Sequence, residues 1–453
     1  MSTATDVSPE PPLDTARHIR YWQRCFHTVL PYHYTSNDSI RLTLGFFIIS
    51  ALDLLSASSP TPLITSQDRS RLRAWVLRLQ HPHGGFCGSP HHVLPKDLTS
   101  TYDRKTGTEV ARDPSNANIA ATGFALLCLG VLGEGDGSDA LRGVNRVQTL
   151  TWLKKLQRED GSFGELLTEQ GQVSGGRDMR YCYLAAIIRW ALGAADGDPA
   201  LDFDVDALVG HIRRGQTFDG GMGESSTHES HSGYAYCAVA ALALLDSANP
   251  DPSAAPDHYL HTGIPSISSL IRFLVSRQFI YLEPKSEGGE EDEEDDATPN
   301  HPLPDLSSLS LSDLEPQLAG FNGRLNKVPD TCYTWWNSGA LSLLGQDKLI
   351  SRGPARRFIL EKTQHRIGGF AKHPDGPPDI YHAYLGLAAL ATIAGPAGEP
   401  GLAKFHPGLC ISADAAARIA KAKETVLNPH YSDVSDDDDD DFDDNGWSTG
   451  KTK

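Results

Sequence analysis

The sequence predicts an all-α protein in which six helix pairs form a closed α/α barrel, or toroid, with inner and outer helical rings. Two observations lead to this fold class. Five similar glycine turns recur along the chain, and internal repeats of this kind are typical of stacked supersecondary units. Each turn also lies between two kinds of helix, one with a single apolar face and one that is apolar nearly all round. An open superhelix of the same pairs is the alternative.

The glycine turns mark the boundary between the two helices of each pair. Their sequences are LQHPHGGFCG (79–88), LQREDGSFGE (156–165), GQTFDGGMGE (215–224), LAGFNGR (318–324) and TQHRIGGFAK (363–372). We expect each turn to end an outer helix, with glycine supplying the left-handed conformation that often follows a helix C-terminus.

The helices on the two sides of a turn differ in where their apolar residues fall. Segment 69–80 has one apolar face, with i, i+3, i+4, i+7 spacing at Leu72, Trp75, Val76 and Leu79. Such a face predicts an outer helix. Inner-type helices, rich in Ala and Gly, begin near residues 41, 118, 180, 232, 331 and 380. Five amphipathic helices accompany them, and the N-terminal or C-terminal helix is expected as the sixth partner. The starts of the inner helices then converge on one rim, where we expect the chemistry.

Most of the net charge of −18 lies in two acidic runs. Residues 283–296 and 433–444 together supply −17 of it, which leaves the rest of the chain nearly neutral. We interpret them as a disordered acidic insertion (283–300) and a disordered tail (426–453). The predicted organisation is a flexible N-terminus (1–15) followed by a barrel domain (16–425). This charge excludes nucleic acid as an expected partner.

The chain is expected to be a cytoplasmic protein rather than an integral membrane protein. It contains no uninterrupted apolar run of the length needed to cross a bilayer, and its first residues lack the pattern of a signal peptide. Seven cysteines without a CxxC pair favour reduced thiols over a disulfide framework.

Candidate metal ligands lie at the start of two inner helices. Asp330 and Cys332 are separated by one residue, and His382 opens the following inner helix. Three protein ligands with an open fourth position describe a catalytic zinc site. The alternative is a helix-capping Asp beside a buried Cys.

A candidate diphosphate site lies beside them. His231 precedes the fourth inner helix, whose start favours an anion. Arg324 and Lys327 precede the next inner helix, and with Tyr333 they are expected to face one diphosphate. A capping or core histidine is the alternative interpretation of His231.

In this order and spacing, the glycine turns and the segments ESHSGY, GRLNK, DTCYTWW and DIYHAYLGL resemble the β subunits of protein prenyltransferases over residues 20–395. The resemblance implies an α/α barrel and one zinc ion held by Asp330, Cys332 and His382. By the same resemblance, the residues at the isoprenoid diphosphate are His231, Ser232, Gly233, Arg324, Lys327 and Tyr333, and those along the lipid pocket are Arg180, Tyr183, Tyr234, Cys237 and Trp336.

The family resemblance also implies the reaction and its partners. The thiol of a C-terminal CaaX cysteine, on small GTPase-type proteins, attacks C1 of an isoprenoid diphosphate. A helical-repeat α subunit completes a heterodimer and is expected to supply a further lysine to the diphosphate.

Two positions favour one branch of the family, the type I geranylgeranyltransferases. Farnesyltransferases carry Trp where this chain has Thr43 and Asp where it has Lys372. Thr43 leaves room for a fourth isoprene unit, so geranylgeranyl diphosphate is the expected donor. Lys372 is expected to be a catalytic residue that supplies positive charge in place of Mg²⁺, so the reaction is expected not to require Mg²⁺. Asn118 replaces an expected His near the last residue of the peptide, where Leu or Phe is the default. The alternatives are a farnesyltransferase, a terpene cyclase-like barrel and a non-catalytic helical scaffold.

Overall fold

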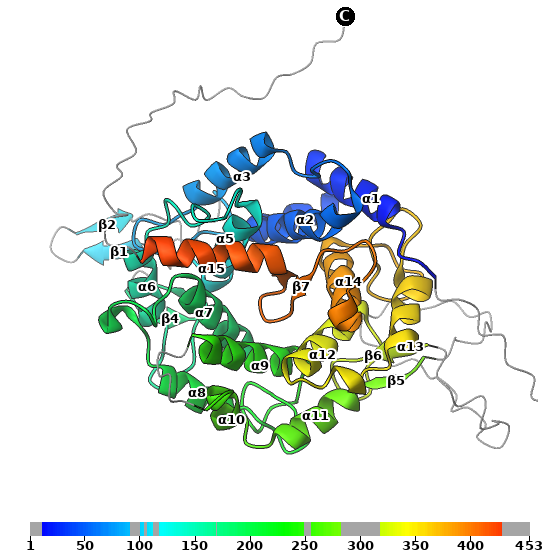
Figure 1. Cartoon of the computed structure of the whole chain (residues 1–453). Helices are drawn as coiled ribbons and strands as arrows, with labels where there is room; N and C mark the ends of the chain where they lie inside the picture. Colours follow the sequence, from blue (N-terminus) through cyan, green and yellow to red (C-terminus); the bar gives the residue numbers. More distant parts are fainter. Residues whose placement is uncertain are drawn as a thin grey trace, which may run out of the picture.

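The computed structural model describes residues 11–90, 100–103, 107–111, 117–168, 170–248, 255–281 and 318–427. Its helices form two concentric rings, as predicted (Figure 1). The inner ring consists of α2 (Arg41–Leu55), α5 (Ile119–Leu132), α7 (Met179–Ala191), α9 (Ser232–Ser247), α12 (Thr331–Leu343) and α14 (Ile380–Ile393). The outer ring consists of α1 (Thr15–His27), α3 (Ser66–Arg78), α6 (Arg146–Lys155), α8 (Val205–Arg214), α11 (Ile267–Val275) and α13 (Arg352–Arg357), the last continued by a π-helical turn, η7 (Phe358–Thr363).

The remaining elements are short, apart from one helix. They are the helices α10 (His258–Gly263) and α15 (Ala413–Val426) and the 3-10 turns η1 (Tyr32–Ile40), η2 (Ser56–Ser58), η3 (Pro199–Leu201), η6 (Asp347–Leu349) and η8 (Gly395–Ala397). Four antiparallel strand pairs connect helices: β1 (Ser100–Asp103) with β2 (Thr108–Ala111), β3 (Leu166–Leu167) with β4 (Val173–Ser174), β5 (Gln278–Ile280) with β6 (Ala319–Phe321), and β7 (Phe405–His406) with β8 (Ile411–Ser412).

The ring is closed. Each inner helix contacts the next one along the chain, and α14 returns to contact α2. The N-terminal helix α1 is the sixth outer partner, whereas α15 packs on α5 and α7 across one end of the barrel (Figure 1). The open superhelix considered from the sequence is therefore wrong.

The glycine turns close this ring in a way that the sequence analysis did not anticipate. No left-handed glycine caps the described outer helices: α3 ends at Leu79 with φ −84°, and α8 ends at Gly215 with φ −81°. A backbone bridge between Gln80 and Phe86 follows, and Gly84 sits at its tip with φ +102°. A Cβ on Gly84 would lie 2.1 Å from the carbonyl oxygen of Gln148 in the next outer helix.

The same contact recurs around the ring. A Cβ on Gly161, Gly220 or Gly368 would lie 1.9, 2.5 and 2.5 Å from the carbonyl oxygens of Ala207, Ser269 and Arg17, respectively. The last of these pairs joins the final turn to α1. The turn at 318–324 differs, because there β6 pairs with β5. Glycine is thus required at four of the five turns, because each of these four packs directly against the backbone of the following helix.

The two ends of the predicted barrel domain, residues 16 and 425, can be compared with where packed structure begins and ends. Leu13 is buried and Asp14 accepts a hydrogen bond from the N–H of Arg17, so packing begins before residue 16, and α15 extends to Val426. The acidic insertion, and the acidic tail beyond residue 427, lie outside the described residues, and their assignment stays a prediction.

One helical run is long and apolar enough to span a membrane by length and composition alone. It covers Tyr32–Ser58, with a mean hydropathy of 1.7 in its most apolar window, and 61% of that window is buried. The sequence analysis did not single out this run, because polar residues such as Ser50 and Asp53 interrupt it without lowering its average hydropathy much. The segment contains α2, an inner helix of the barrel.

We expect Gly161→Ala to destabilise the protein far more than Gly171→Ala. Both glycines have positive φ, +83° and +75°, so both alanines would carry backbone strain of about 1–2 kcal/mol. Only Gly161 faces the backbone of the next outer helix, whereas nothing lies within 4 Å of a Cβ at Gly171. The added clash should bring the loss at Gly161 to about 3 kcal/mol or more. Thermal unfolding of the two variants measures the difference, and equal midpoints would show that the contact does not hold the ring.

Candidate active site

Polar side chains cap five of the six inner helices at one rim of the barrel. Each accepts a hydrogen bond from a backbone N–H of the first turn, and the capping residues are Asn118, Asp178, His231, Asp330 and Asp379. Helix starts carry unpaired N–H groups and partial positive charge, so anionic or acceptor groups are favoured there. The rim predicted from the sequence is therefore lined by residues that cap helices and can also contact a ligand.

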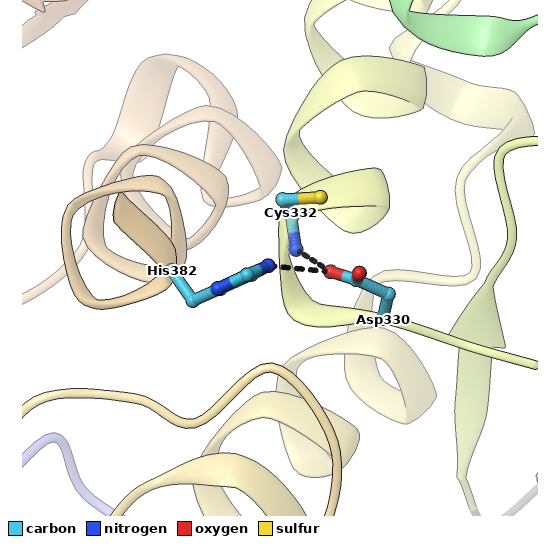
Figure 2. Close-up of side chains that lie close together, drawn as sticks. All are labelled: Asp330, Cys332 and His382. Carbon is cyan, nitrogen blue, oxygen red and sulfur yellow. Dashed lines mark hydrogen bonds and ion pairs between the residues drawn. The ribbon is translucent and has the colours of Figure 1, made fainter. Parts of the chain in front are cut away.

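The three predicted metal ligands meet at this rim. The ligand atoms of Asp330, Cys332 and His382 all lie within 4.8 Å of one another. Figure 2 shows Asp330 and Cys332 at the start of α12 and His382 reaching across from α14. Asp330 Oδ1 accepts a hydrogen bond from the Cys332 N–H at 2.7 Å and lies 3.4 Å from His382 Nε2. Asp330 thus caps the helix and also belongs to a cluster that could hold a metal ion.

Asp379 supports His382 and was not identified from the sequence. Its Oδ2 is 2.6 Å from His382 Nδ1, and its Oδ1 accepts from the His382 backbone N–H. Nδ1 therefore carries a proton toward Asp379, and Nε2 faces Asp330. A carboxylate holding the remote nitrogen of a histidine is a common support of metal ligands. The sequence signal was the Asp three residues before His382, which also predicts a helix cap.

The cluster holds protons that a metal ion would displace. Burial on its own would lower the pKa of His382, but hydrogen bonds to Asp330 and Asp379 raise it to about 9. Burial opposes the charge on Asp330, yet its hydrogen bonds with His382 and Cys332 hold its pKa below the usual value. Burial and the adjacent Asp330 carboxylate raise the pKa of the Cys332 thiol well above its usual range. A nitrogen, an oxygen and a sulfur donor at this spacing fit one divalent metal ion.

His231 and Tyr333 form a second polar unit beside the cluster. His231 Nδ1 accepts from the Gly233 N–H at 2.9 Å, so its proton sits on Nε2 and is donated to the Tyr333 hydroxyl at 3.0 Å. Burial, and then the charges of Arg324 and Arg180, lower the pKa of His231 to about 4. The imidazole is therefore neutral at pH 7, and the Tyr333 hydroxyl hydrogen remains available to a ligand. Ser232 is buried, and its N–H donates to the carbonyl of Gly323.

The predicted cations differ in their surroundings. Arg324 pairs with Glu229 at 3.2 Å on the exposed side of the rim, and Lys327 lies three residues further in the same loop. Arg180 makes two hydrogen bonds to Asp178, at 2.8 and 2.9 Å. The side chain of Lys372 is exposed, while its carbonyl accepts from the Thr331 N–H at 3.0 Å. The structure thus brings Lys372 next to the start of α12.

An apolar cavity of about 670 Å³ opens beside these groups. Of the predicted residues, those lining it are Thr43, Arg180, Tyr183, Cys237 and Trp336. Tyr234, predicted in the wall, instead lies outside the lining, with its ring 5.0 Å from that of His231 and 5.8 Å from the Arg180 guanidinium. Its position at the helix start directs it to the rim.

Several lining residues were missed by the sequence analysis. Some belong to helices that the repeat had located, namely Phe46, Phe47, Phe124 and Tyr381, whereas Leu409 and Cys410 belong to the segment after α14. In the sequence, the four aromatic residues cannot be told from residues of the hydrophobic core. Nothing in the sequence pointed to Leu409 and Cys410, because their segment follows the last glycine turn and lies outside the repeats.

Comparisons with known proteins agree with this geometry. The prenyltransferase alpha-alpha toroid domain family matches residues 13–411. The geranylgeranyl transferase type-1 subunit beta of Arabidopsis thaliana is 29% identical over 419 residues, covering 90% of this chain and 91% of that protein. The protein farnesyltransferase subunit beta of Schizosaccharomyces pombe is 25% identical over 416 residues, covering 86% and 82%. A solved structure of Candida albicans protein geranylgeranyltransferase-I complexed with GGPP has a TM-score of 0.68 and 26% identity, and the match covers 92% of this chain and 100% of that one.

We expect metal uptake to release about two protons at pH 7, one from His382 and one from Cys332. Both groups are protonated there, because the pKa of His382 is raised to about 9 and that of Cys332 is higher still. The apparent affinity should accordingly rise with pH between 6 and 9. Calorimetric titration of the metal-free protein with Zn²⁺, in buffers of different ionisation enthalpy, counts the protons.

Asp379→Asn is the matched variant for this count. It removes the charge that helps to raise the pKa of His382 but keeps an acceptor at the helix start, so fewer protons should be released at pH 7. Metal binding without proton release in the unmodified protein would contradict the assigned ligands.

Proposed function

The chain belongs to the prenyltransferase α/α toroid family, and on this premise we propose that it is the β subunit of a type I protein geranylgeranyltransferase. The observation that carries the proposal is the start of α12, where three kinds of group meet. Asp330 and Cys332 belong to the metal-type cluster, Tyr333 pairs with His231, and Trp336 lines the apolar cavity. Metal, diphosphate and lipid sites must adjoin in an enzyme that joins a thiol to an isoprenoid carbon.

The proposed reaction transfers a 20-carbon isoprenoid to a C-terminal CaaX cysteine, with Leu or Phe favoured at the last position. The sulfur forms a bond to C1 of the isoprenoid, the bond from C1 to the diphosphate oxygen breaks, and the thiol proton passes to solvent. Asp330, Cys332 and His382 would hold a zinc ion, whose donor preferences match this set. Zinc lowers the pKa of a bound thiol and so supplies a nucleophile at neutral pH.

The residues around His231 act on the leaving group. The Tyr333 hydroxyl oxygen accepts a hydrogen bond from the Nε2–H of neutral His231. The hydroxyl hydrogen can therefore be donated to a diphosphate oxygen. Arg324 and Lys327 add positive charge in the adjoining loop. Donors fixed where negative charge develops stabilise the transition state more than the ground state. Arg324 would exchange its exposed ion pair with Glu229 for one with the diphosphate. The cost in free energy would be small, because exposed ion pairs contribute little to stability.

Lys372 is proposed to take the place of a magnesium ion. Its backbone is fixed by the hydrogen bond to Thr331, next to the metal-type cluster, and its exposed side chain is free to swing toward the rim. A lysine ammonium cannot bind Mg²⁺ but can lie against phosphate oxygens as a point charge. Transfer should accordingly require no added Mg²⁺.

The partners are proposed from the family. An α subunit would complete the heterodimer and contribute a further lysine to the diphosphate, CaaX proteins of the small GTPase type would be the acceptors, and the enzyme would work in the cytoplasm.

Prenyl transfer by the chain co-expressed with a type I α subunit tests the function. We expect geranylgeranyl transfer to peptides ending in Leu in preference to Ser, dependent on Zn²⁺ and unaffected by removal of Mg²⁺. Cys332→Ala should lose at least about 10³-fold in kcat/KM, because a ligand of the site is removed. Metal content measured on the same sample separates loss of the ion from loss of folding. Transfer that persists in metal-free Cys332→Ala would contradict the proposal.

We expect Thr43→Trp to shift the donor preference toward farnesyl diphosphate. Thr43 lines the cavity from α2, and an indole there fills the space of roughly one isoprene unit. The kcat/KM ratio of the 15-carbon to the 20-carbon donor should rise at least about tenfold. Thr43→Ser, which keeps the volume small, is the control. A variant that retains the original preference would show that Thr43 does not limit lipid length.

A further inference from the structure

The segment after the last inner helix enters the barrel and occupies part of its interior. We define the plug as residues 405–412, which comprise β7, a tip at 407–410 and β8. The plug enters at the end opposite the rim, because the Ala403 N–H donates to the carbonyl of Leu54 and Ser412 Oγ donates to the Asp53 carboxylate, both near the end of α2. Figure 1 shows the β7 loop inside the ring, next to α15.

Four inner helices hold the tip of the plug through the same position. The fifth residue of each is aromatic with a donor group: Tyr183 in α7, Tyr236 in α9, Trp335 in α12 and Tyr384 in α14. The tyrosine hydroxyls donate to the carbonyls of Gly408, Pro407 and Cys410 at 3.0, 2.7 and 2.6 Å, in that order of helices. The Trp335 Nε1–H points to Cys410 Sγ at 2.9 Å.

These contacts make the tip rigid. Tyr183, Tyr236 and Tyr384 are buried, so breaking their hydrogen bonds would leave carbonyls unpaired in an apolar interior. Cys410 has φ +54°, a conformation that residues other than glycine adopt at a cost and keep only where their surroundings impose it. The clamp of aromatic donors imposes it here.

The tip also forms part of the wall of the lipid cavity. Leu409 and Cys410 line the cavity, and Leu409 is completely buried. Along α7 the cavity extends from Arg180, near the rim, to Ile187, about 10 Å further into the barrel. Polar groups lie at the rim end, whereas the residues deeper along the inner helices are apolar. The tip, bonded to the fifth residues of four inner helices, therefore forms one wall of the cavity, which continues along α7 past that level to Ile187.

We propose that the plug is a second determinant of isoprenoid length, in which Leu409 and Cys410 set the longest donor that the cavity admits. The inference rests on the proposed function and extends it. Thr43 limits the cavity from α2, whereas the plug limits it from a segment outside the repeats. A wall limits the length of the bound isoprenoid only if it resists displacement, and the hydrogen bonds from four inner helices supply this resistance.

Enlarging the cavity at the plug tests the proposal. We expect Leu409→Ala, in the full chain with its α subunit, to raise the kcat/KM ratio of the 25-carbon to the 20-carbon diphosphate at least about tenfold. Cys410→Gly should shift the ratio in the same direction and remain well folded, because glycine accepts the positive φ. Leu402→Ala is the matched control, since Leu402 is buried in the same segment but does not line the cavity, and it should leave the ratio unchanged.

Removing one hydrogen bond to the plug tests whether these bonds help to limit isoprenoid length. Tyr384→Phe keeps the ring that packs on Phe46 and Phe47 and removes the hydroxyl bound to Cys410. The same ratio should rise roughly three- to tenfold, the effect of one hydrogen bond.

Direct binding of non-hydrolysable 15-, 20- and 25-carbon diphosphate analogues separates this proposal from the proposed function. If the unmodified enzyme transfers no isoprenoid, the proposed function fails, and the binding ratios of the variants still judge the plug. Unchanged binding and kinetic ratios in both Leu409→Ala and Cys410→Gly would overturn it.

Discussion

The structure depends on one steric constraint, the direct contact between four of the glycine turns and the backbone of the next outer helix. Gly84, Gly161, Gly220 and Gly368 stand where any side chain would overlap a carbonyl oxygen. The residues that anchor these turns, such as Phe86 and Phe370, are completely buried. Because the last turn meets α1, the repeats form a ring rather than a spiral. A closed ring of parallel inner helices then has all its helix starts on one rim.

The rim uses the same atoms for stability and for the candidate chemistry. Asp330 and His231 cap α12 and α9, and both also face the space where ligands would bind. Asp379 caps α14 while fixing the tautomer of His382. Burying such polar groups is costly unless they are paired, and the helix N–H groups provide partners even without a ligand. This explains how a site with several buried polar groups remains folded when empty of substrate.

The cavity is built from two parts of the chain, the helical repeats and a segment that follows them. The repeats provide most of its wall, including Thr43, Phe124 and Trp336. The plug provides Leu409 and Cys410 and lies outside the repeat pattern. Its hold on the barrel comes from one position of the repeat, the fifth residue of α7, α9, α12 and α14. A regular scaffold thus fixes an irregular segment through side-chain donors.

The sequence by itself determined the helix pairs and singled out three residues, Asp330, Cys332 and His382, that the structure brings together. Apolar periodicity is local, so residues such as Leu72 and Val76 report their helix face directly. The separation of Asp330 and Cys332 by one residue is equally local. His382 was assigned because it opens the next inner helix and because the family resemblance implies a ligand there.

Only the tertiary structure decided how these parts meet. The role of Gly84 depends on Gln148, the support of His382 by Asp379 depends on side-chain orientation, and the place of Tyr234 depends on Arg180 and His231. The plug depends on contacts such as Tyr183 with Gly408, residues that are 225 positions apart. The aromatic fifth residues of the inner helices recur in the sequence, but their partners in the plug do not, because hydrogen bonding between distant segments is set by the closed ring as a whole.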